Sequence, residues 1–337
     1  MITSLQHVGL GVTDAAASYD FYKKVLGFPV KISDYVGASK EMEPIIGELV
    51  KMRIIMALSA RGRGLVELVQ YLSTSPRPLE MRWGDIGFLA TGYRVDNLPG
   101  FINRLQQIGV KPKVRSYVTE LASRQRWESA FLADPDGNLI ELVDISPGAP
   151  VEPNVSGLVQ VTVGVRDIDK SLPFYRDILG YNVTLLDIVQ EEPGLQPLFG
   201  RSFAQRQVLL QRTERLNGPF VTSDGGVIRL VQVLGYQGKE LFAGRRWGDI
   251  GQMECCFEVD DIRAAVAEVE RSMKTKAYCS PTYMDMGAGT NAFFAYIKDP
   301  DGTLIEFDEV KKVLWMKPLV FAAVLRFFFP VIAWMSR

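Results

Sequence analysis

Two stretches of the chain are nearly identical: "DPDGNLIELVDI" at residues 134–145 and "DPDGTLIEFDEV" at residues 299–310. Each begins with a turn sequence and continues as an apolar run, which is typical of a β-strand that follows a tight turn. At the same position of each run, after Leu-Ile, stands a glutamate, Glu141 or Glu306. A carboxylate that faces a protein core is costly unless a cation or water accompanies it, so both are candidate functional residues. The alternatives are an outward-facing side chain, which strand alternation allows, and a structural role common to both copies.

The two stretches belong to a longer internal repeat. "LQHVGLGVTDAAASYDFYKKVLGF" (5–28) aligns without gaps with "LVQVTVGVRDIDKSLPFYRDILGY" (158–181), and "RWGDIG" occurs at both 82–87 and 246–251. We therefore predict two copies of one domain, a linker rich in Pro, Gly and Ser, and a hydrophobic tail. Their predicted ranges are 1–145 and 158–310 for the domains, 146–157 for the linker and 311–337 for the tail.

Each copy divides again into two similar halves, in which a strand is followed by a helix and by further strands. Asp14 and Asp96 are the predicted N-caps of the two helices in the first copy. In the third unit, Asp169 as the N-cap would place Pro173 in the first helical turn, where proline is tolerated. The chain is therefore predicted to form four βαβββ units of an α+β fold.

Composition excludes several classes of protein. Charged residues make up 23% of the chain and the net charge is −1, which does not suit a nucleic-acid-binding protein. The three cysteines include an adjacent pair and make a poor disulfide framework, which favours a reducing, cytoplasmic environment. The N-terminal sequence "MITSLQHVGLGV" lacks the basic start and long apolar run of a signal peptide.

Four βαβββ units, the "FYKKVLGF" helix end and the repeated "DPDGNLIEL" strand resemble the vicinal oxygen chelate superfamily. This family contains glyoxalase I, extradiol dioxygenases and the bleomycin resistance proteins, and the resemblance covers about residues 5–310. It implies that the units form two half-barrel cups, each made by two units that curl around a divalent metal. The metal ligands of the family come from the first and last strands of each unit.

The ligand positions of the family can be transferred to this chain unit by unit. They hold His7 and Glu67, then Ala90 and Glu141, then Gln160 and Arg229, and finally Glu254 and Glu306. If the units pair in chain order, each cup contains unsuitable residues. If the first unit pairs with the fourth, as in glyoxalase I, one cup collects His7, Glu67, Glu254 and Glu306 as metal ligands. We favour this second arrangement, in which Glu141 is a relic paired with Arg229.

The resemblance implies one divalent metal ion, and an oxygen-rich set with one histidine suits Mn²⁺, Mg²⁺, Fe²⁺, Ni²⁺ or Zn²⁺ better than copper. His7 is the only histidine, so the chain alone cannot supply the two-histidine, one-carboxylate triad of an extradiol dioxygenase. The predicted function is that of a lyase or isomerase that removes a proton beside a carbonyl, with Glu306 as the base and Glu254 as the second candidate. The alternative is a non-catalytic ligand-binding or membrane-complex assembly protein with a degenerate metal site.

The tail "KKVLWMKPLVFAAVLRFFFPVIAWMSR" (311–337) has no counterpart in the first copy. Residues 313–335 are all apolar except Lys317, Pro318, Arg326 and Pro330. The arginine and the second proline disfavour a spanning helix, so we predict a helix that lies in the membrane interface. The predicted partners are then a membrane surface or membrane complex and a lipophilic small-molecule substrate. The alternative is a helix that packs on the domains or on a partner protein.

Overall fold

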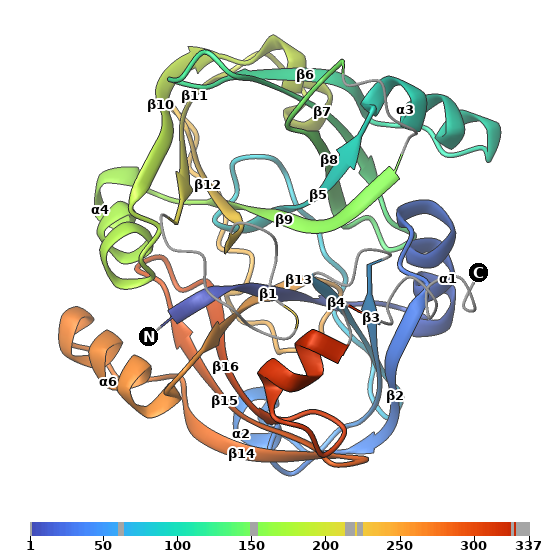
Figure 1. Ribbon diagram of the computed structural model, residues 1–337. Helices are drawn as coiled ribbons and strands as arrows, with labels where there is room; N and C mark the ends of the chain where they lie inside the picture. The colour runs from blue at the N-terminus through green and yellow to red at the C-terminus, as the bar shows by residue number, and fades with distance from the viewer. Residues whose placement is uncertain are drawn as a thin grey trace.

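The computed structural model describes residues 2–59, 64–148, 154–212, 220, 225–324 and 327. These residues form two sheets of eight strands each, shown in the lower and upper halves of Figure 1. The order in the first sheet is β14 (Cys279–Gly287), β15 (Thr290–Lys298), β16 (Leu304–Lys312), β13 (Gly251–Val259), β1 (Ile2–Gly11), β4 (Leu65–Tyr71), β3 (Lys51–Leu58) and β2 (Val30–Ala38). The order in the second sheet is β10 (Val183–Glu191), β11 (Ala204–Gln211), β12 (Val227–Val233), β9 (Asn154–Gly164), β5 (Gly87–Asp96), β8 (Leu139–Asp144), β7 (Arg126–Ala133) and β6 (Val114–Glu120).

The first sheet is made by the first and fourth units, and the second sheet by the second and third units. The units of each sheet are joined through antiparallel pairs of their first strands, β1 with β13 and β5 with β9. Within each unit the first strand is parallel to the last, as β1 is to β4 and β13 is to β16. This order confirms the arrangement favoured from the sequence, in which the first unit pairs with the fourth.

The helices are short. In the described residues they are α1 (Ala15–Leu26), α2 (Glu43–Ile46), α3 (Leu98–Gln107), α4 (Ile168–Pro173), the π-helix η1 (Phe174–Ile178), the 3₁₀-helix η2 (Pro193–Leu195), α5 (Gln196–Phe199) and α6 (Ile262–Met273), with a further helix at 318–324 in the tail. Asp14 caps α1 as expected, by accepting hydrogen bonds from the backbone N–H groups of Ala16 and Ala17. The predicted cap Asp96 is wrong, because the side chain that accepts from Gly100 N is that of Asn97.

The third unit differs from its prediction at the proline. The N-cap is Asp167 and not Asp169, so Pro173 is the sixth residue of α4 and lies outside the first turn. Proline has no N–H to donate to the preceding turn, and the helix changes there from α to the π-helix η1. The sequence prediction erred by placing the helix start two residues too late.

One apolar core joins the two sheets and contains residues of all four units. Strand alternation sends Val66 and Leu68 of β4 into this core and Leu65, Glu67 and Val69 to the opposite, concave face of the sheet. The second sheet has the same arrangement, so that each sheet forms a cup whose interior faces away from the shared core. We call the cup of the first sheet the first cup and that of the second sheet the second cup.

The repeated Asp-Pro-Asp-Gly turns connect the two sheets. In the second unit, the Asp136 carboxylate accepts a hydrogen bond from Thr13 N at 2.9 Å, just before α1 of the first unit. In the fourth unit, the equivalent Asp301 accepts from Arg166 N at 3.1 Å, just before α4 of the third unit. Each turn thus binds the start of a helix that belongs to the other sheet, which accounts for the conservation of this motif between the two copies of the repeat.

The described part of the tail packs beside the first cup. Strand β16 continues to Lys312, and a helix follows at residues 318–324. Phe321 of this helix packs in an apolar cluster with Leu58 and Leu65, and its ring centroid lies 5.6 Å from that of Phe220. Among the residues that the structure describes, no helix has the length and apolarity needed to cross a membrane. Residues 325, 326 and 328–337, which include Arg326 and Pro330, lie outside the described residues.

Candidate metal centre

The four predicted ligands lie on four neighbouring strands of the first sheet. His7 and Gly9 are on β1; Gly9 pairs with Glu67 on β4 and with Glu254 on β13, and Cys256 of β13 pairs with Glu306 on β16. This register places all four side chains on the concave face. A Cβ atom at Gly9 would collide with the carboxylate of Glu254, so only glycine leaves room for that carboxylate between β1 and β13.

The side-chain tips of these residues converge. The distance from His7 Nε2 to Glu306 Oε2 is 3.2 Å, and that to Glu67 Oε2 is 4.0 Å. Ligand atoms of His7, Glu67 and Glu254 lie within 4.8 Å of one another, as do those of His7, Cys256 and Glu306. His7, Glu254 and Glu306 are buried, and the side chain of Glu67 is only 12% exposed. His7 belongs to both groups, so the structure places each of the other three predicted ligands beside it.

Burial raises the pKa of each carboxyl group in this cluster. Burial together with the charge of Glu306 raises the pKa of Glu254 to about 8. Burial raises the pKa of Glu306 to about 7, although a hydrogen bond from Tyr296 opposes the shift. The pKa of Glu67 is raised well above its usual value by burial and by the charge of Glu254. Carboxylates this close cannot all be ionised in a buried site unless a cation is bound.

The histidine and two carboxylate oxygens have electron pairs that no hydrogen bond uses. Burial lowers the pKa of His7, so its imidazole is neutral near pH 7 and retains one lone pair. Among the described residues, Glu254 Oε1 and Glu306 Oε2 have no hydrogen-bond donor. Unpaired buried oxygens are uncommon in proteins and call for a physical partner. Their position beside a neutral imidazole suits a divalent cation.

Several polar side chains of the first cup were not predicted from the sequence. They are Gln6, Trp247, Cys256, Glu258, Tyr296 and Asp308, all of which are buried. The Trp247 indole N–H donates to Glu254 Oε2 at 2.6 Å, and Tyr296 lies close enough to Glu254 and Glu306 to counter the rise of the pKa of both. Cys256 and Asp308 follow Glu254 and Glu306 by two residues, so strand alternation could have placed them on the same face. Gln6 directly precedes His7, and the alternation of a regular strand would place it on the other face.

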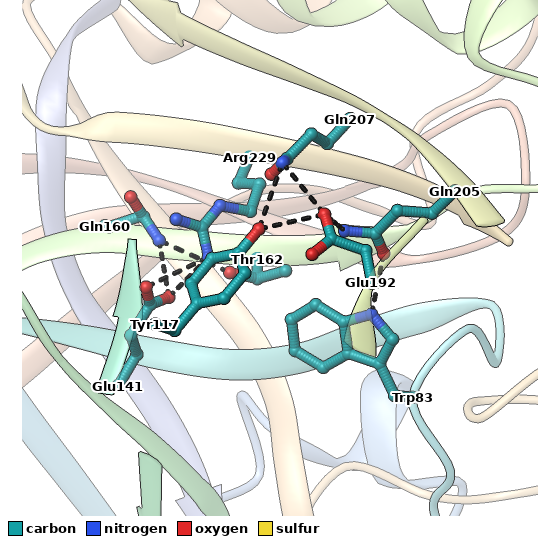
Figure 2. A network of polar contacts seen from close by, with 9 residues as sticks. All are labelled: Trp83, Tyr117, Glu141, Gln160, Thr162, Glu192, Gln205, Gln207 and Arg229. Atoms are coloured by element: carbon teal, nitrogen blue, oxygen red, sulfur yellow. Dashed lines mark hydrogen bonds and ion pairs between the residues drawn. The ribbon is translucent and has the colours of Figure 1, made fainter. Parts of the chain in front are cut away.

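The second cup contains an ion pair at the equivalent positions (Figure 2). Arg229 Nη1 donates to both oxygens of Glu141, at 3.0 and 2.8 Å, and Gln160 Nε2 donates to Glu141 Oε2 at 2.8 Å. The fourth position is Ala90, which has no ligand atom. A guanidinium group is permanently charged and cannot bind a metal ion, so it replaces a cation here. The predicted pairing of Glu141 with Arg229 is confirmed.

A second buried carboxylate in this cup is surrounded by hydrogen-bond donors (Figure 2). Glu192 Oε1 accepts from the Tyr117 hydroxyl group at 3.0 Å and from the side-chain amides of Gln205 and Gln207 at 2.9 and 3.2 Å. Gln190, which is not drawn in the figure, also donates to this oxygen at 3.0 Å. The indole N–H of Trp83 in turn donates to Gln205 Oε1 at 2.8 Å. These neutral donors satisfy the carboxylate of Glu192, in contrast to the unpaired oxygens of the first cup.

Comparison with known proteins agrees with this architecture. The Glyoxalase/Bleomycin resistance protein/Dioxygenase superfamily model matches residues 4–142 and 157–307. Glyoxalase I from Zea mays has a similar structure, with a TM-score of 0.57 at 18% identity over 91% of this chain and 92% of that chain. A putative dioxygenase from Bacillus subtilis gives 0.56 at 14% identity over 93% and 87%. No curated protein matches the sequence. At these identities the structural likeness establishes the fold alone.

Proposed function

Because the chain belongs to the glyoxalase/bleomycin resistance protein/dioxygenase superfamily, we propose that it is a metal-dependent lyase or isomerase that acts on a small carbonyl compound. The observation that carries the proposal is that His7 is common to two close groups of ligand atoms, one with Glu67 and Glu254 and one with Cys256 and Glu306, and that Glu254 and Glu306 each have an unpaired buried oxygen. One neutral imidazole and three carboxylates match the ligand preferences of Mn²⁺, Mg²⁺, Fe²⁺, Ni²⁺ and Zn²⁺. A bound divalent ion would supply a Lewis acid that polarises a carbonyl group.

The residues of the first cup have separate roles in this proposal. Glu306 is the base, because its Oε2 is free of hydrogen bonds and burial raises its pKa to about 7, near the pH at which a general base works best. Glu254 is the second candidate for this role. Tyr296, which lies close to both carboxylates, would supply one hydroxyl group to the site. His7 and Glu67 would also hold the ion.

The apolar surroundings of the cluster support a lipophilic substrate. Leu65 and Val69 flank Glu67 on the same face of β4; Leu65 belongs to an apolar cluster with Phe321, and Val69 to another with Met52 and Phe294. Apolar side chains favour contact with apolar groups and offer few hydrogen bonds to a sugar or a phosphate. The carbonyl compound is therefore proposed to carry an apolar group.

Metal binding tests the proposal directly. Protein purified without chelator should contain about one equivalent of a divalent metal by inductively coupled plasma mass spectrometry, or take it up from Mn²⁺, Ni²⁺ or Zn²⁺. Removing a residue that only supports a metal ligand typically weakens metal binding about 10–100-fold. Glu306 is itself a proposed ligand, so Glu306→Gln should weaken metal binding by at least this factor. Glu309→Gln is the matched control, because Glu309 lies on the same strand but accepts hydrogen bonds from Ile262 N and Lys311. A wild-type protein that takes up no divalent metal would leave the non-catalytic binding protein as the better interpretation.

We also propose that the tail binds a membrane surface. The inner face of the helix at 318–324 packs on the first cup through Phe321, whereas Leu319 on its outer face is 61% exposed and Trp315, just before it, is 78% exposed. Val320 and Val324 are also exposed, and Lys312 and Lys317 are exposed nearby. An apolar face with flanking tryptophan and lysine suits the interface of an anionic membrane.

A charge-insertion variant tests this membrane proposal without removing the packed face of the helix. The wild-type protein should float with phosphatidylserine-containing vesicles at low salt, and the double variant Leu319→Glu/Val324→Glu should bind about tenfold or more weakly. The reason is that burial of one such side chain is worth about 1.5–3 kcal/mol. Thermal melting of both proteins controls for folding. If the wild-type protein stays in the soluble fraction when vesicles float, the tail does not bind membranes.

A further inference from the structure

A β-bulge in β1 brings Gln6 to the same side of the sheet as His7. In the pairing of β1 with β13, Leu5 is opposite Phe257 and His7 is opposite Cys256, so that Gln6 is an extra residue without a partner. Bulges of this kind re-aim a side chain and are frequent next to active sites. Here the bulge buries both Gln6 and His7 next to the carboxylate cluster.

The contacts of Gln6 determine which nitrogen of His7 carries a proton. Gln6 Nε2 donates to Glu258 Oε2 at 3.3 Å, and Gln6 Oε1 lies 2.9 Å from His7 Nδ1. An amide nitrogen only donates, and Glu258 Oε2 can accept both as a carboxylate oxygen and as the carbonyl oxygen of the acid. This contact sets the orientation of the amide, and the amide oxygen then faces Nδ1. An oxygen acceptor at 2.9 Å requires that Nδ1 carries the hydrogen. The other nitrogen, Nε2, is the one that faces Glu306 and Glu67.

The second copy of the repeat provides an internal comparison. Its first strand, β9, has the same bulge, because Leu158 is opposite Tyr93 and Gln160 is opposite Gly92, with Val159 between them. The bulge is therefore a property of the fold, and it persists where the histidine is replaced by Gln160. The pair of Gln6 and Glu258 does not persist, since the equivalent residues are Val159 and Arg94. Arg94 is partly exposed and lies 3.7 Å from Asp96.

We propose that Gln6 and Glu258 are positioning residues that hold the proton of His7 on Nδ1 and direct the Nε2 lone pair toward the carboxylate cluster. The statement that this lone pair binds a metal ion rests on the proposed function. The hydrogen bonds from Glu258 through Gln6 to His7 are present in the metal-free protein. Outer-shell partners of this kind fix the tautomer and the ring orientation of a ligand histidine. The substrate is not contacted, so neither residue is a catalytic residue.

The chain has a single histidine, and this makes the test unusually direct. In ¹⁵N-histidine-labelled, metal-free protein, two-bond ¹H–¹⁵N correlation spectra should show a protonated Nδ1 whose hydrogen exchanges slowly with solvent. In Gln6→Leu, which has no acceptor, the slow exchange should be lost and the proton should redistribute between the two nitrogens. Gln6→Glu, which keeps an acceptor oxygen, should restore the protonated Nδ1. An unprotonated Nδ1 in the wild-type protein, or an unchanged spectrum in Gln6→Leu, would overturn the proposal.

A second pair of variants tests the role of Glu258. Glu258→Gln keeps an oxygen that accepts from Gln6 and should preserve the wild-type spectrum, whereas Glu258→Leu should release the amide and increase exchange at Nδ1. If both variants behave alike, Glu258 does not orient Gln6, and its part of the proposal is wrong. Thermal melting shows whether each variant is folded, and the spectrum of a folded variant is decisive because mere packing would not move a proton between nitrogens.

Metal titration separates this inference from the proposed function. If the wild-type protein binds Zn²⁺, Gln6→Leu should bind it about 10–100-fold more weakly, the usual effect of losing an outer-shell partner. Glu258→Gln should bind close to the wild-type affinity. If the wild-type protein binds no metal, the proposed function fails, and the spectra of the metal-free variants still decide whether Gln6 fixes the tautomer. Equal affinity of Gln6→Leu and wild type would contradict a positioning role toward the metal.

Discussion

Replacing Arg229 with methionine is expected to lower the free energy of unfolding by about 3–5 kcal/mol, as measured by urea denaturation. Arg229 and Glu141 are both completely or almost completely buried, and the arginine donates two hydrogen bonds to the carboxylate. Without the guanidinium group, Glu141 remains in the core as a charge, and Gln160 is its one remaining side-chain donor among the described residues. Removing one partner of a buried ion pair is costly because the remaining charge has neither water nor an opposite charge beside it.

Two controls distinguish this mechanism from a simple loss of contacts. The double variant Glu141→Leu/Arg229→Met removes both charges and should be between neutral and about 1–4 kcal/mol more stable than the wild-type protein. The gain is favoured here because Arg229 Nε and Nη2 have no acceptor among the described residues. Arg206→Ala breaks a pair with Asp187 that is partly exposed, and should cost only about 0–1 kcal/mol. A loss below 1 kcal/mol for Arg229→Met would show that this ion pair is not a determinant of stability.

The repeats explain why so much of the fold could be predicted. Because the alignment of 5–28 with 158–181 has no gaps, each strand and helix of one copy indicates its counterpart in the other. The four units could pair in two ways, and only one of them collected all the suitable metal ligands in one cup. The sheet order shows this arrangement. The candidate ligands of the first cup were transferred from the family resemblance. Strand alternation is regular around Glu67 and Glu306, whereas the pairing of β13 with β1 is irregular beside Glu254.

Cys256 and Asp308 could have been found by strand alternation, whereas Gln6 depends on a feature that the sequence does not display. A bulge adds one residue to a strand without changing its composition, so nothing in "LQHVGL" indicates that Gln6 and His7 share a face. The start of α4 was misplaced because Asp167 and Asp169 are both good N-cap residues and only the backbone conformation distinguishes them. The reaction is a different matter, since a fold shared at 18% identity accommodates several chemistries.

The metal-free protein is expected to lose stability as the pH rises from about 5 to about 8. Buried carboxyl groups of the first cup have a higher pKa in the folded protein than in the unfolded chain. The pKa rises from 4.5 to about 8 for Glu254 and Glu258, from 4.5 to about 7 for Glu306, and from 3.8 to about 7 for Asp308. Between the two values the folded state holds more protons, so the free energy of unfolding falls as pH rises. The shift of Glu306 alone corresponds to about 3 kcal/mol.

Other titrating groups do not cancel this fall. Surface carboxylates such as Asp187 have a lowered pKa in the folded protein. They contribute their full stabilisation at every pH above the pKa of the unfolded chain, so their contribution no longer changes between pH 5 and pH 8. The lowered pKa of His7 makes the free energy of unfolding rise with pH near pH 6.5. This is the effect of one group, whereas several carboxyl groups act in the other direction. Burial raises the pKa of Asp134 and Asp299 to about 6, which adds to the fall but does not depend on a metal.

A divalent metal should reverse the loss, because it binds the ionised carboxylates and only in the folded state. In EDTA, the melting temperature should be lower at pH 8 than at pH 5. With Zn²⁺ or Mn²⁺ at about 100 times the dissociation constant, the protein should regain about 2.7 kcal/mol at pH 8 and much less at pH 5, where protons compete for the ligands. The variant Glu254→Gln/Glu306→Gln should show a shallower fall with pH and no response to metal, since it lacks two of the raised carboxyl groups and two proposed ligands. A melting temperature in EDTA that stays constant or rises between pH 5 and pH 8 would mean that these carboxyl groups are not kept protonated by the fold, and the first cup would then need another source of positive charge.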